Sequence, residues 1–499
     1  MYSAIFCVGI FTLILCALNA WRLQASRRRF ISHIPGPRAV SWLYGNMPEL
    51  LLSREYGEHE FQWQKQYGPV YRIKGCFSEN RLMISDPVAA KHIINNPVFI
   101  HGGSQQKAAN ILFGEGNVFL AEAYSGKGES PNLARTMSDI ELILESQLVD
   151  RWESLGFPGN TVDVAPTLHD AALDAMGDGI LGHSFNALLG AIESAPHMYP
   201  VIRSQTKIGL LVDAIIPCVP GFLFRLALRI PLAGVLAMQA FIRITDDLTS
   251  HLVQESRDEL SNGIESDQTF IRNFLDYSPE NPISTPFDVK DIAIQLRAVL
   301  IASEDTSGNT AGWVLYKLAQ MPDLQTALRE EIRLASVDGR DELDYDAMPV
   351  LKAVINETLR FYAPLPLAER VPTEDCVLPL TDPIITSTGE RITELPIKKG
   401  QNLYVTIASY NRLPSAWGPD AYEFRPSRWL EKDGILSNGM GIGPRAPLVL
   451  ELQVFVVELI QKFVLSVPEN DSVRPCVVIT LVPKTADGVQ CLPLHVEAV

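Results

Sequence analysis

The segment LKAVINETLRFYAPLPLAERV, residues 351–371, places Glu357 and Arg360 three positions apart and so on one face of a predicted helix. Pairs with this spacing usually lie on a protein surface, where each contributes about 0.2–0.5 kcal/mol. Here the surrounding positions are largely apolar, which leaves the helix little face to turn toward solvent. A guanidinium group also suits a buried, bidentate contact with a carboxylate. The segment therefore predicts a buried ion pair.

A third charged residue is expected to join this pair. The segment WGPDAYEFRPSRWL, residues 417–430, carries Arg428 flanked by Pro426 and Trp429. A glutamate held between two arginines would fix this loop against the helix that carries Glu357 and Arg360.

Residues 288–318 are predicted to form one long helix that is apolar toward both ends. Its middle is polar, because six of the seven positions from 303 to 309 carry a hydroxyl, carboxyl or amide group. Buried polar groups are unfavourable without partners, so these side chains are expected to face water or a ligand. Asp305 and Thr306 are the candidate catalytic residues, because a buried acid beside a hydroxyl can pass protons inward from solvent. The alternative is a helix kink lined with water.

The composition excludes several classes of protein. The chain has 499 residues with 58 acidic and 42 basic side chains, and its net charge of -16 would repel nucleic acid. The seven cysteines are scattered singly, which argues against a disulfide framework or a structural zinc site. Residues 64–118 alternate β-rich and helical pieces, and helical patterns dominate after about residue 140.

The N-terminal region predicts a membrane anchor. Residues 4–21 carry no charge, and their number is close to the roughly 20 that cross a bilayer as a helix. Four arginines follow by residue 29, so the positive-inside bias leaves the rest of the chain in the cytosol. A cleaved secretory signal is the alternative, but no small-residue cleavage pattern follows the apolar run. We expect an anchor at residues 1–22, a basic flank with a Pro-Gly-Pro hinge at residues 23–40, and one large domain at residues 41–499.

A second apolar region covers residues 208–242. Three prolines and two arginines interrupt it, so two short helices with an exposed apolar loop fit better than a second membrane-spanning helix. That loop would rest on the membrane surface. Ordinary buried helices are an equally good interpretation of the pattern.

Five features occur in one order along the chain: the anchor with its hinge, A-S-E-D-T-S at residues 302–307, E-T-L-R at 357–360, P-D-A-Y-E-F-R-P-S-R-W at 419–429, and G-P-R at 443–445. Together they resemble a membrane-bound eukaryotic cytochrome P-450 of fungal type over nearly the whole chain. The resemblance implies a cytochrome P-450 fold, mainly α with small β-sheets and a long central helix, preceded by one transmembrane helix. It implies a haem cofactor and oxidation of a lipophilic small molecule, in secondary metabolism. Electrons would come from NADPH-cytochrome P-450 reductase at the endoplasmic reticulum membrane, with the globular domain in the cytosol.

The resemblance also implies roles for individual residues. Asp305 and Thr306 match the acid–alcohol pair of the family's long helix, which delivers protons to iron-bound oxygen. Residues 363–367 resemble a substrate-contacting loop, and residues 208–242 resemble the access region that dips into the membrane. The positions that match cofactor-binding residues are the structural triad Glu357, Arg360 and Arg428, and the haem-propionate contacts Arg370 and Arg445.

The resemblance breaks at the haem-binding loop. The family pattern F-x-x-G-x-R-x-C-x-G, laid over MGIGPRAPLV at residues 440–449, matches at Gly443 and Arg445 but places Pro447 at the cysteine. No metal ligand is therefore expected there, although a thiolate ligand is what favours O–O cleavage in this family. A second departure lies at residues 124–135, a short glycine-rich segment where the family has a helix carrying Trp-x-x-x-Arg. Both departures resemble deletions.

Three interpretations follow from this combination. The first is a haem-dependent monooxygenase whose transcript encodes longer loops than this chain has. The second is a haemless relative that holds a hydrophobic ligand or a partner enzyme at the membrane. The third is the product of a decayed gene, which folds poorly. A distant cysteine such as Cys376 would be the remaining source of a thiolate if folding brought it to bound iron.

Overall fold

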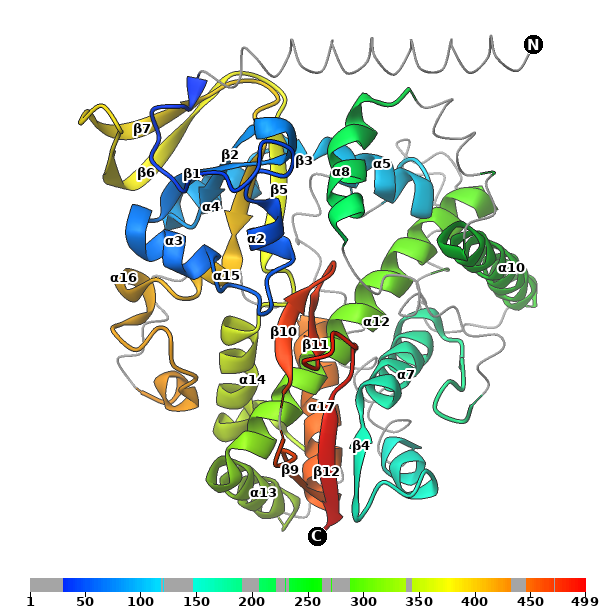
Figure 1. Ribbon diagram of the computed structural model, residues 1–499. Helices are drawn as coiled ribbons and strands as arrows, with labels where there is room; N and C mark the ends of the chain where they lie inside the picture. Colours follow the sequence, from blue (N-terminus) through cyan, green and yellow to red (C-terminus); the bar gives the residue numbers. More distant parts are fainter. Residues whose placement is uncertain are drawn as a thin grey trace.

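Helix α12 (Val289–Gln320) runs through the middle of the protein in the computed structural model (Figure 1). Two acidic residues, Asp288 and Asp291, lie at its N-terminus, where the helix dipole favours negative charge. The backbone N–H of Asp288 donates to the Asp291 carboxylate at 3.2 Å. The helix is continuous over its whole length. This confirms the long central helix expected from the sequence, and the polar segment does not kink it.

The structure describes residues 30–117, 120, 147–190, 206–220, 229, 233–262, 271, 288–337, 343–431, 446–470 and 472–499. Within these ranges no helix combines the length and apolar character needed to cross a bilayer. The predicted anchor at residues 1–22 lies outside them, as do Arg445 and residues 124–135. The transmembrane helix and the domain boundaries therefore stay predictions.

The main hydrophobic core surrounds the second half of α12, and Trp313, Trp152 and Phe455 are among its fully buried residues. Helix α7 lies close against α12 at Gly308, where a Cβ atom would lie 2.9 Å from the His169 ring. The helices that pack around α12 in this core are α7 (Ala165–Met176), α13 (Pro322–Val337), α14 (Pro349–Phe361) and α17 (Ala446–Lys462).

A five-stranded sheet forms a second layer, seen at the upper left of Figure 1, with the strand order β1-β2-β8-β5-β3. Strands β2 and β8 pair in parallel, whereas the other neighbours are antiparallel. Its strands are β1 (Val70–Lys74), β2 (Asn80–Ile84), β3 (Phe99–His101), β5 (Leu367–Pro372) and β8 (Leu403–Thr406).

The other strands of the described residues form three smaller sheets. The hairpin of β6 and β7 packs with helix α4 on the outer side of the large sheet. The remaining strands are β4 (Asn160–Asp163), β6 (Cys376–Ile385), β7 (Arg391–Ile397), β9 (Phe463–Ser466), β10 (Arg474–Val477), β11 (Leu481–Lys484) and β12 (Pro493–Ala498). The mainly helical fold with small sheets is confirmed. Helices dominate the described residues after residue 140, as predicted, although residues 367–406 and 463–498 hold most of the described strands.

The other described helices lie around this frame. They are α2 (Met47–Leu51), α3 (Glu60–Tyr67), α4 (Pro87–Asn95), α5 (Gly103–Leu112), α8 (Lys207–Ile215), α10 (Ala233–Ser261), α15 (Ile407–Tyr410) and α16 (Pro414–Trp417). In the apolar region 208–242, α8 is short, as predicted, and its Ile208 and Val212 are exposed. Most of the predicted apolar loop lies outside the described residues. The second helix was wrongly expected to be short, because α10 continues to Ser261.

A single lysine ties helix α5 to the short 3-10 helix that follows α8. The Lys107 ammonium donates to three backbone carbonyls, those of Ile216 (2.9 Å), Pro217 (3.1 Å) and Val219 (2.8 Å). Carbonyl groups at a helix C-terminus lack partners within the helix, and a cation there also interacts favourably with the helix dipole. Lys107 therefore fastens residues 216–219 to α5.

Replacing Lys107 by methionine is expected to loosen this connection. Methionine keeps an unbranched side chain of similar reach but donates no hydrogen bond. A hydrogen bond to a charged group contributes about 1.5–3 kcal/mol, so amide hydrogen exchange in residues 207–219 should become at least about tenfold faster. Mass spectrometry of deuterated peptides measures this. Lys91→Met, on the exposed face of α4, is the control and should leave the exchange of residues 207–219 unchanged. Equal exchange rates in the Lys107→Met and Lys91→Met variants would show that Lys107 does not hold residues 216–219 against α5.

Candidate active site

The helix that carries Glu357 and Arg360 is held at its start by another helix. Pro349 occupies the first position of α14, and the next two backbone N–H groups, of Val350 and Leu351, donate to the Glu331 carboxylate of α13 at 2.8 and 2.9 Å. A carboxylate at a helix N-terminus satisfies donors that have no partner within the helix. This contact fixes the position from which Glu357 and Arg360 project.

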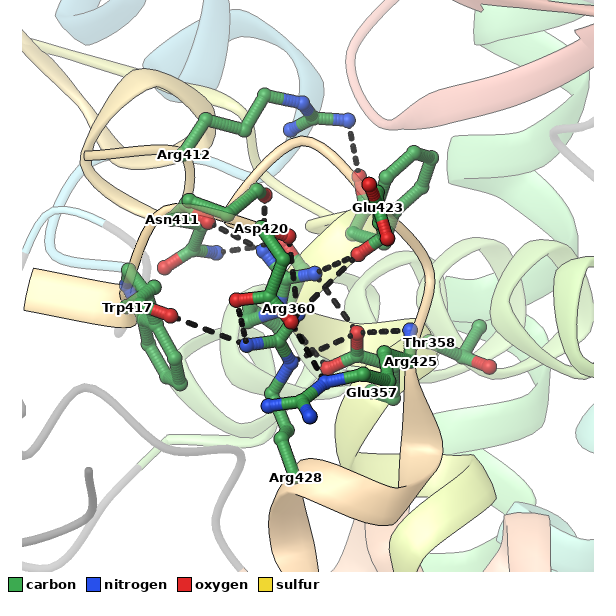
Figure 2. A network of polar contacts seen from close by, with 12 residues as sticks. Glu357, Thr358, Arg360, Asn411, Arg412, Trp417, Asp420, Glu423, Arg425 and Arg428 are labelled. Atoms are coloured by element: carbon green, nitrogen blue, oxygen red, sulfur yellow. Dashed lines mark hydrogen bonds and ion pairs between the residues drawn. The ribbon is translucent and has the colours of Figure 1, made fainter. Parts of the chain in front are cut away.

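Glu357 is fully buried and accepts hydrogen bonds from four groups (Figure 2). Arg360 makes a bidentate contact with it, at 2.7 and 2.8 Å. The Arg428 guanidinium donates at 3.1 Å, the Trp429 indole at 2.9 Å and the Arg425 backbone N–H at 2.6 Å. The structure confirms both sequence predictions, that the ion pair is buried and that Arg428 joins it.

The remaining donors of Arg360 fix the loop that carries Arg428. They donate to the backbone carbonyls of Asn411 (2.6 Å), Ala421 (2.8 Å) and Glu423 (2.7 Å), as Figure 2 shows. A buried ion pair is favourable only when its remaining polar atoms are also paired, and here they are. Residues 411–428 are therefore held against α14. The described contacts of Glu357, Arg360 and Arg428 are contacts within the protein. A direct role of these three residues in cofactor binding stays a prediction.

The polar middle of α12 is paired largely within the protein. The Thr306 hydroxyl donates to the Ala302 carbonyl one turn earlier at 2.6 Å. The Ser307 hydroxyl donates to the Glu451 carboxylate of α17, and burial raises the pKa of Glu451 to about 7. These contacts explain how an apolar helix tolerates a polar segment without a kink.

The Asp305 carboxylate is held by two side chains. One oxygen accepts from the Thr480 hydroxyl at 2.5 Å, and the other accepts from the Asn309 amide at 3.0 Å. Burial raises the pKa of Asp305 and the two hydrogen bonds partly oppose that shift. Thr480 lies in the turn between β10 and β11. No local sequence pattern predicts its contact with Asp305, because 175 residues separate the two.

The β10–β11 turn also contacts the loop that resembles a substrate-contacting segment. The Trp313 indole of α12 donates to the Leu481 carbonyl at 2.8 Å, and the Leu481 backbone N–H donates to the Pro364 carbonyl at 3.0 Å. The turn therefore joins α12 to residues 363–367. Asp305 and this loop were predicted separately from the sequence, and they meet the same turn.

Arg370, the described residue predicted to contact a haem propionate, lies on strand β5. It faces His101 across the pairing of β5 with β3, and its guanidinium donates to the Glu369 carbonyl at 2.9 Å. Burial, followed by the Arg370 charge, lowers the pKa of His101 to about 4, so the imidazole is neutral near pH 7. Among the described residues no carboxylate forms an ion pair with Arg370. A half-buried guanidinium without such a partner fits the carboxylate of a haem propionate.

The position matched to the family's cysteine supplies no thiolate ligand. Pro447 lies in the first turn of α17, at the position matched to the family's cysteine. Cys376 is at the start of β6 opposite Ile397, in the hairpin that Figure 1 places away from α12 and α17. Cys476 on β10 approaches the Arg54 carbonyl instead. The residues present therefore fit a propionate at Arg370 but do not fit thiolate-ligated haem iron.

The comparison with known families agrees with the mainly helical fold with small sheets. The family model "Cytochrome P450" (here written P-450) matches residues 34–486, and the chain belongs to the cytochrome P-450 family. By family it is an oxidoreductase of the monooxygenase class.

Curated relatives come from fungi. The chain is 27% identical to cytochrome P-450 monooxygenase 91 of Postia placenta, over 96% of this chain and 97% of the relative. It is 27% identical to cytochrome P-450 monooxygenase claP of Ampulloclitocybe clavipes, over 85% of this chain and 82% of the relative. It is 29% identical to the monooxygenase eriI of Hericium erinaceus, over 83% of this chain and 81% of the relative.

Proposed function

We propose that the protein oxidises a lipophilic small molecule in fungal secondary metabolism as a haem-dependent monooxygenase. The observation that carries this proposal is a partly buried acid, Asp305, followed directly by the hydroxyl of Thr306 at the centre of α12, in a chain of this family. Asp305 would hold the proton and Thr306 would orient it toward the site. Oxygen activation would come from thiolate-ligated haem, whose cysteine ligand is missing from the matched position, Pro447.

The other matched residues have supporting roles in this proposal. Arg370 and Arg445 would pair with the two propionates of the cofactor. Glu357, Arg360 and Arg428 would hold residues 411–428 in place beside the cofactor-binding loop. Residues 363–367 would contact the substrate, next to the turn that holds Asp305.

The proposal includes an electron donor and a membrane. NADPH-cytochrome P-450 reductase would supply electrons at the endoplasmic reticulum membrane, and an N-terminal anchor at residues 1–22 would hold the domain on its cytosolic side. The exposed apolar side chains of α8, Ile208, Val212 and Ile215, are suited to contact the same membrane surface.

Haem-dependent activity requires a cysteine that this chain lacks between residues 432 and 449. We therefore expect the natural transcript to encode additional residues there, including one cysteine. Sequencing the transcript tests this expectation. Protein expressed from the longer message should bind haem and give a thiolate-type spectrum with carbon monoxide, whereas protein expressed from the present sequence should not. A transcript without a cysteine codon in this loop would count against the proposal.

The second candidate is a haemless protein that holds a hydrophobic ligand or a partner enzyme at the membrane. The observation that favours it is the position of Pro447 within α17, where no thiolate is available. Stoichiometric haem in protein purified from the present sequence, with a thiolate-type spectrum, would eliminate this candidate.

A further inference from the structure

The orientation of the Asp305 carboxylate depends on a residue outside its own helix. Asn309 lies one turn further along α12, so its hydrogen bond to Asp305 moves with the helix. Among the described residues, Thr480 is the side chain from another element that donates to this carboxylate, at 2.5 Å. The Asn309 amide also lies 3.2 Å from the Thr480 hydroxyl, so the three polar groups form one cluster.

The turn that carries Thr480 is itself held in place. Thr480 is 2% exposed. The neighbouring Leu481 accepts from the Trp313 indole at 2.8 Å and donates to the Pro364 carbonyl at 3.0 Å. The hydroxyl therefore reaches Asp305 from a fixed backbone rather than from an exposed, freely moving loop end.

We propose that Thr480 is a positioning residue, which holds the Asp305 carboxylate in a fixed orientation between α12 and the β10–β11 turn. This inference rests on the proposed function, because the proposed function is what gives Asp305 its role. The contact between Thr480 and Asp305 itself is a property of the protein with or without a cofactor. The hydrogen bond from the Thr480 hydroxyl stabilises the ionised form of the Asp305 carboxyl. Without that bond, the carboxylate is no longer held toward residues 478–480.

Other titratable groups do not account for the behaviour of Asp305. From the neighbouring helices, His169 of α7 faces Gly308, and Glu451 of α17 binds Ser307. Neither contributes to the shifted pKa of Asp305, which follows from burial and from the bonds to Thr480 and Asn309. Removing the Thr480 hydroxyl should therefore be visible in the titration of this one carboxyl.

The experiment is an infrared titration of the full-length protein. The C=O band of the protonated Asp305 carboxyl is identified by its absence from Asp305→Asn. Thr480→Val keeps the shape of the side chain but removes the donor, and should raise the pKa of Asp305 by about one unit, the equivalent of one hydrogen bond to a charged group. Thr480→Ser keeps the hydroxyl and should restore a titration like that of the wild type.

The same hairpin offers a matched control. Thr485 donates to the Asp487 carboxylate at 2.5 Å, but at an exposed site, and Thr485→Val should leave the Asp305 band unchanged. An unchanged band in Thr480→Val, with an unchanged thermal midpoint, would overturn the inference. A fall in the thermal midpoint of Thr480→Val together with an unshifted band would assign Thr480 a purely structural role and also overturn it. Absence of haem or turnover defeats the proposed function and leaves this titration interpretable, so the two failures are distinguishable.

Discussion

Replacing Glu357 by glutamine is expected to prevent the protein from reaching a stable folded state. The change removes the negative charge between Arg360 and Arg428, which leaves the buried Arg360 guanidinium without a counter-charge and Arg428 with Asp420 as its remaining acidic partner. Breaking a buried ion pair in this way typically costs about 3–5 kcal/mol. Whole domains are stable by only about 5–15 kcal/mol, so soluble yield should fall sharply and the remaining protein should unfold at much lower denaturant concentration.

The chain contains a matched control for this change. Glu330 and Arg333 have the same spacing on helix α13 and a similar distance of 2.7 Å, but both side chains are more than half exposed. Exposed pairs contribute little, because solvent already stabilises each charge. Glu330→Gln should therefore unfold like the wild type. If Glu357→Gln unfolded at the same denaturant concentration as Glu330→Gln, burial would not be what makes the Glu357 network important.

The Glu357 network could be predicted from the sequence because its evidence is local. Glu357 and Arg360 are three residues apart, and the apolar residues that surround them already indicate a buried helix. Arg428 was found by its motif. In contrast, Glu451 and Thr480 reach α12 from 144 and 175 residues away in the chain. No periodic pattern reports contacts over such separations, so the partners of Ser307 and Asp305 required the three-dimensional structure.

The strands that follow α14 illustrate a different reason for failure. Strand β6 contains Pro379 and Pro383, which disturb the alternating pattern that marks a strand. The strand tolerates them because it belongs to a two-stranded sheet, with an irregularity in its pairing between Pro379 and Ile384. Each proline removes one backbone donor, and a strand with a free edge has donors that need no partner in the sheet. Edge position is a tertiary property that the local sequence does not reveal.

The stability of the protein should depend on two buried carboxyl groups that titrate near neutral pH. Burial raises the pKa of Glu60 and of Glu451 from 4.5 to about 7. Glu60 accepts hydrogen bonds from the Tyr56 and Ser409 hydroxyls, and Glu451 accepts from Ser307. Both carboxyls are therefore protonated in the folded state at mildly acidic pH, whereas in the unfolded chain they are ionised.

This difference fixes the sign of the pH dependence. Below pH 4.5 both states hold these protons, and the stabilisation is fully present. Between pH 4.5 and about 7 the two carboxyls are ionised in the unfolded chain but still protonated in the folded protein. Over this range the free energy of unfolding therefore falls by on the order of 3 kcal/mol for each carboxyl. His101 acts in the opposite direction, because its lowered pKa favours the neutral folded form as pH rises. The carboxyl contribution must therefore be measured as a difference between variants.

The double variant Glu60→Gln, Glu451→Gln isolates that contribution. Glutamine is neutral at every pH, as the protonated glutamate is, and its carbonyl oxygen still accepts one hydroxyl hydrogen bond at each site; at position 60 its NH2 group faces the second hydroxyl as a donor. His101 is unchanged. Denaturant unfolding at about pH 5 and about pH 8 should show that the wild type loses several kcal/mol relative to the double variant as pH rises. Asp375, whose pKa is lowered by Lys398, titrates below this range and does not interfere. If the free energies of unfolding of both proteins changed in parallel, Glu60 and Glu451 would have to be ionised in the folded state, and their burial against Ser409 and Ser307 would not control their protonation.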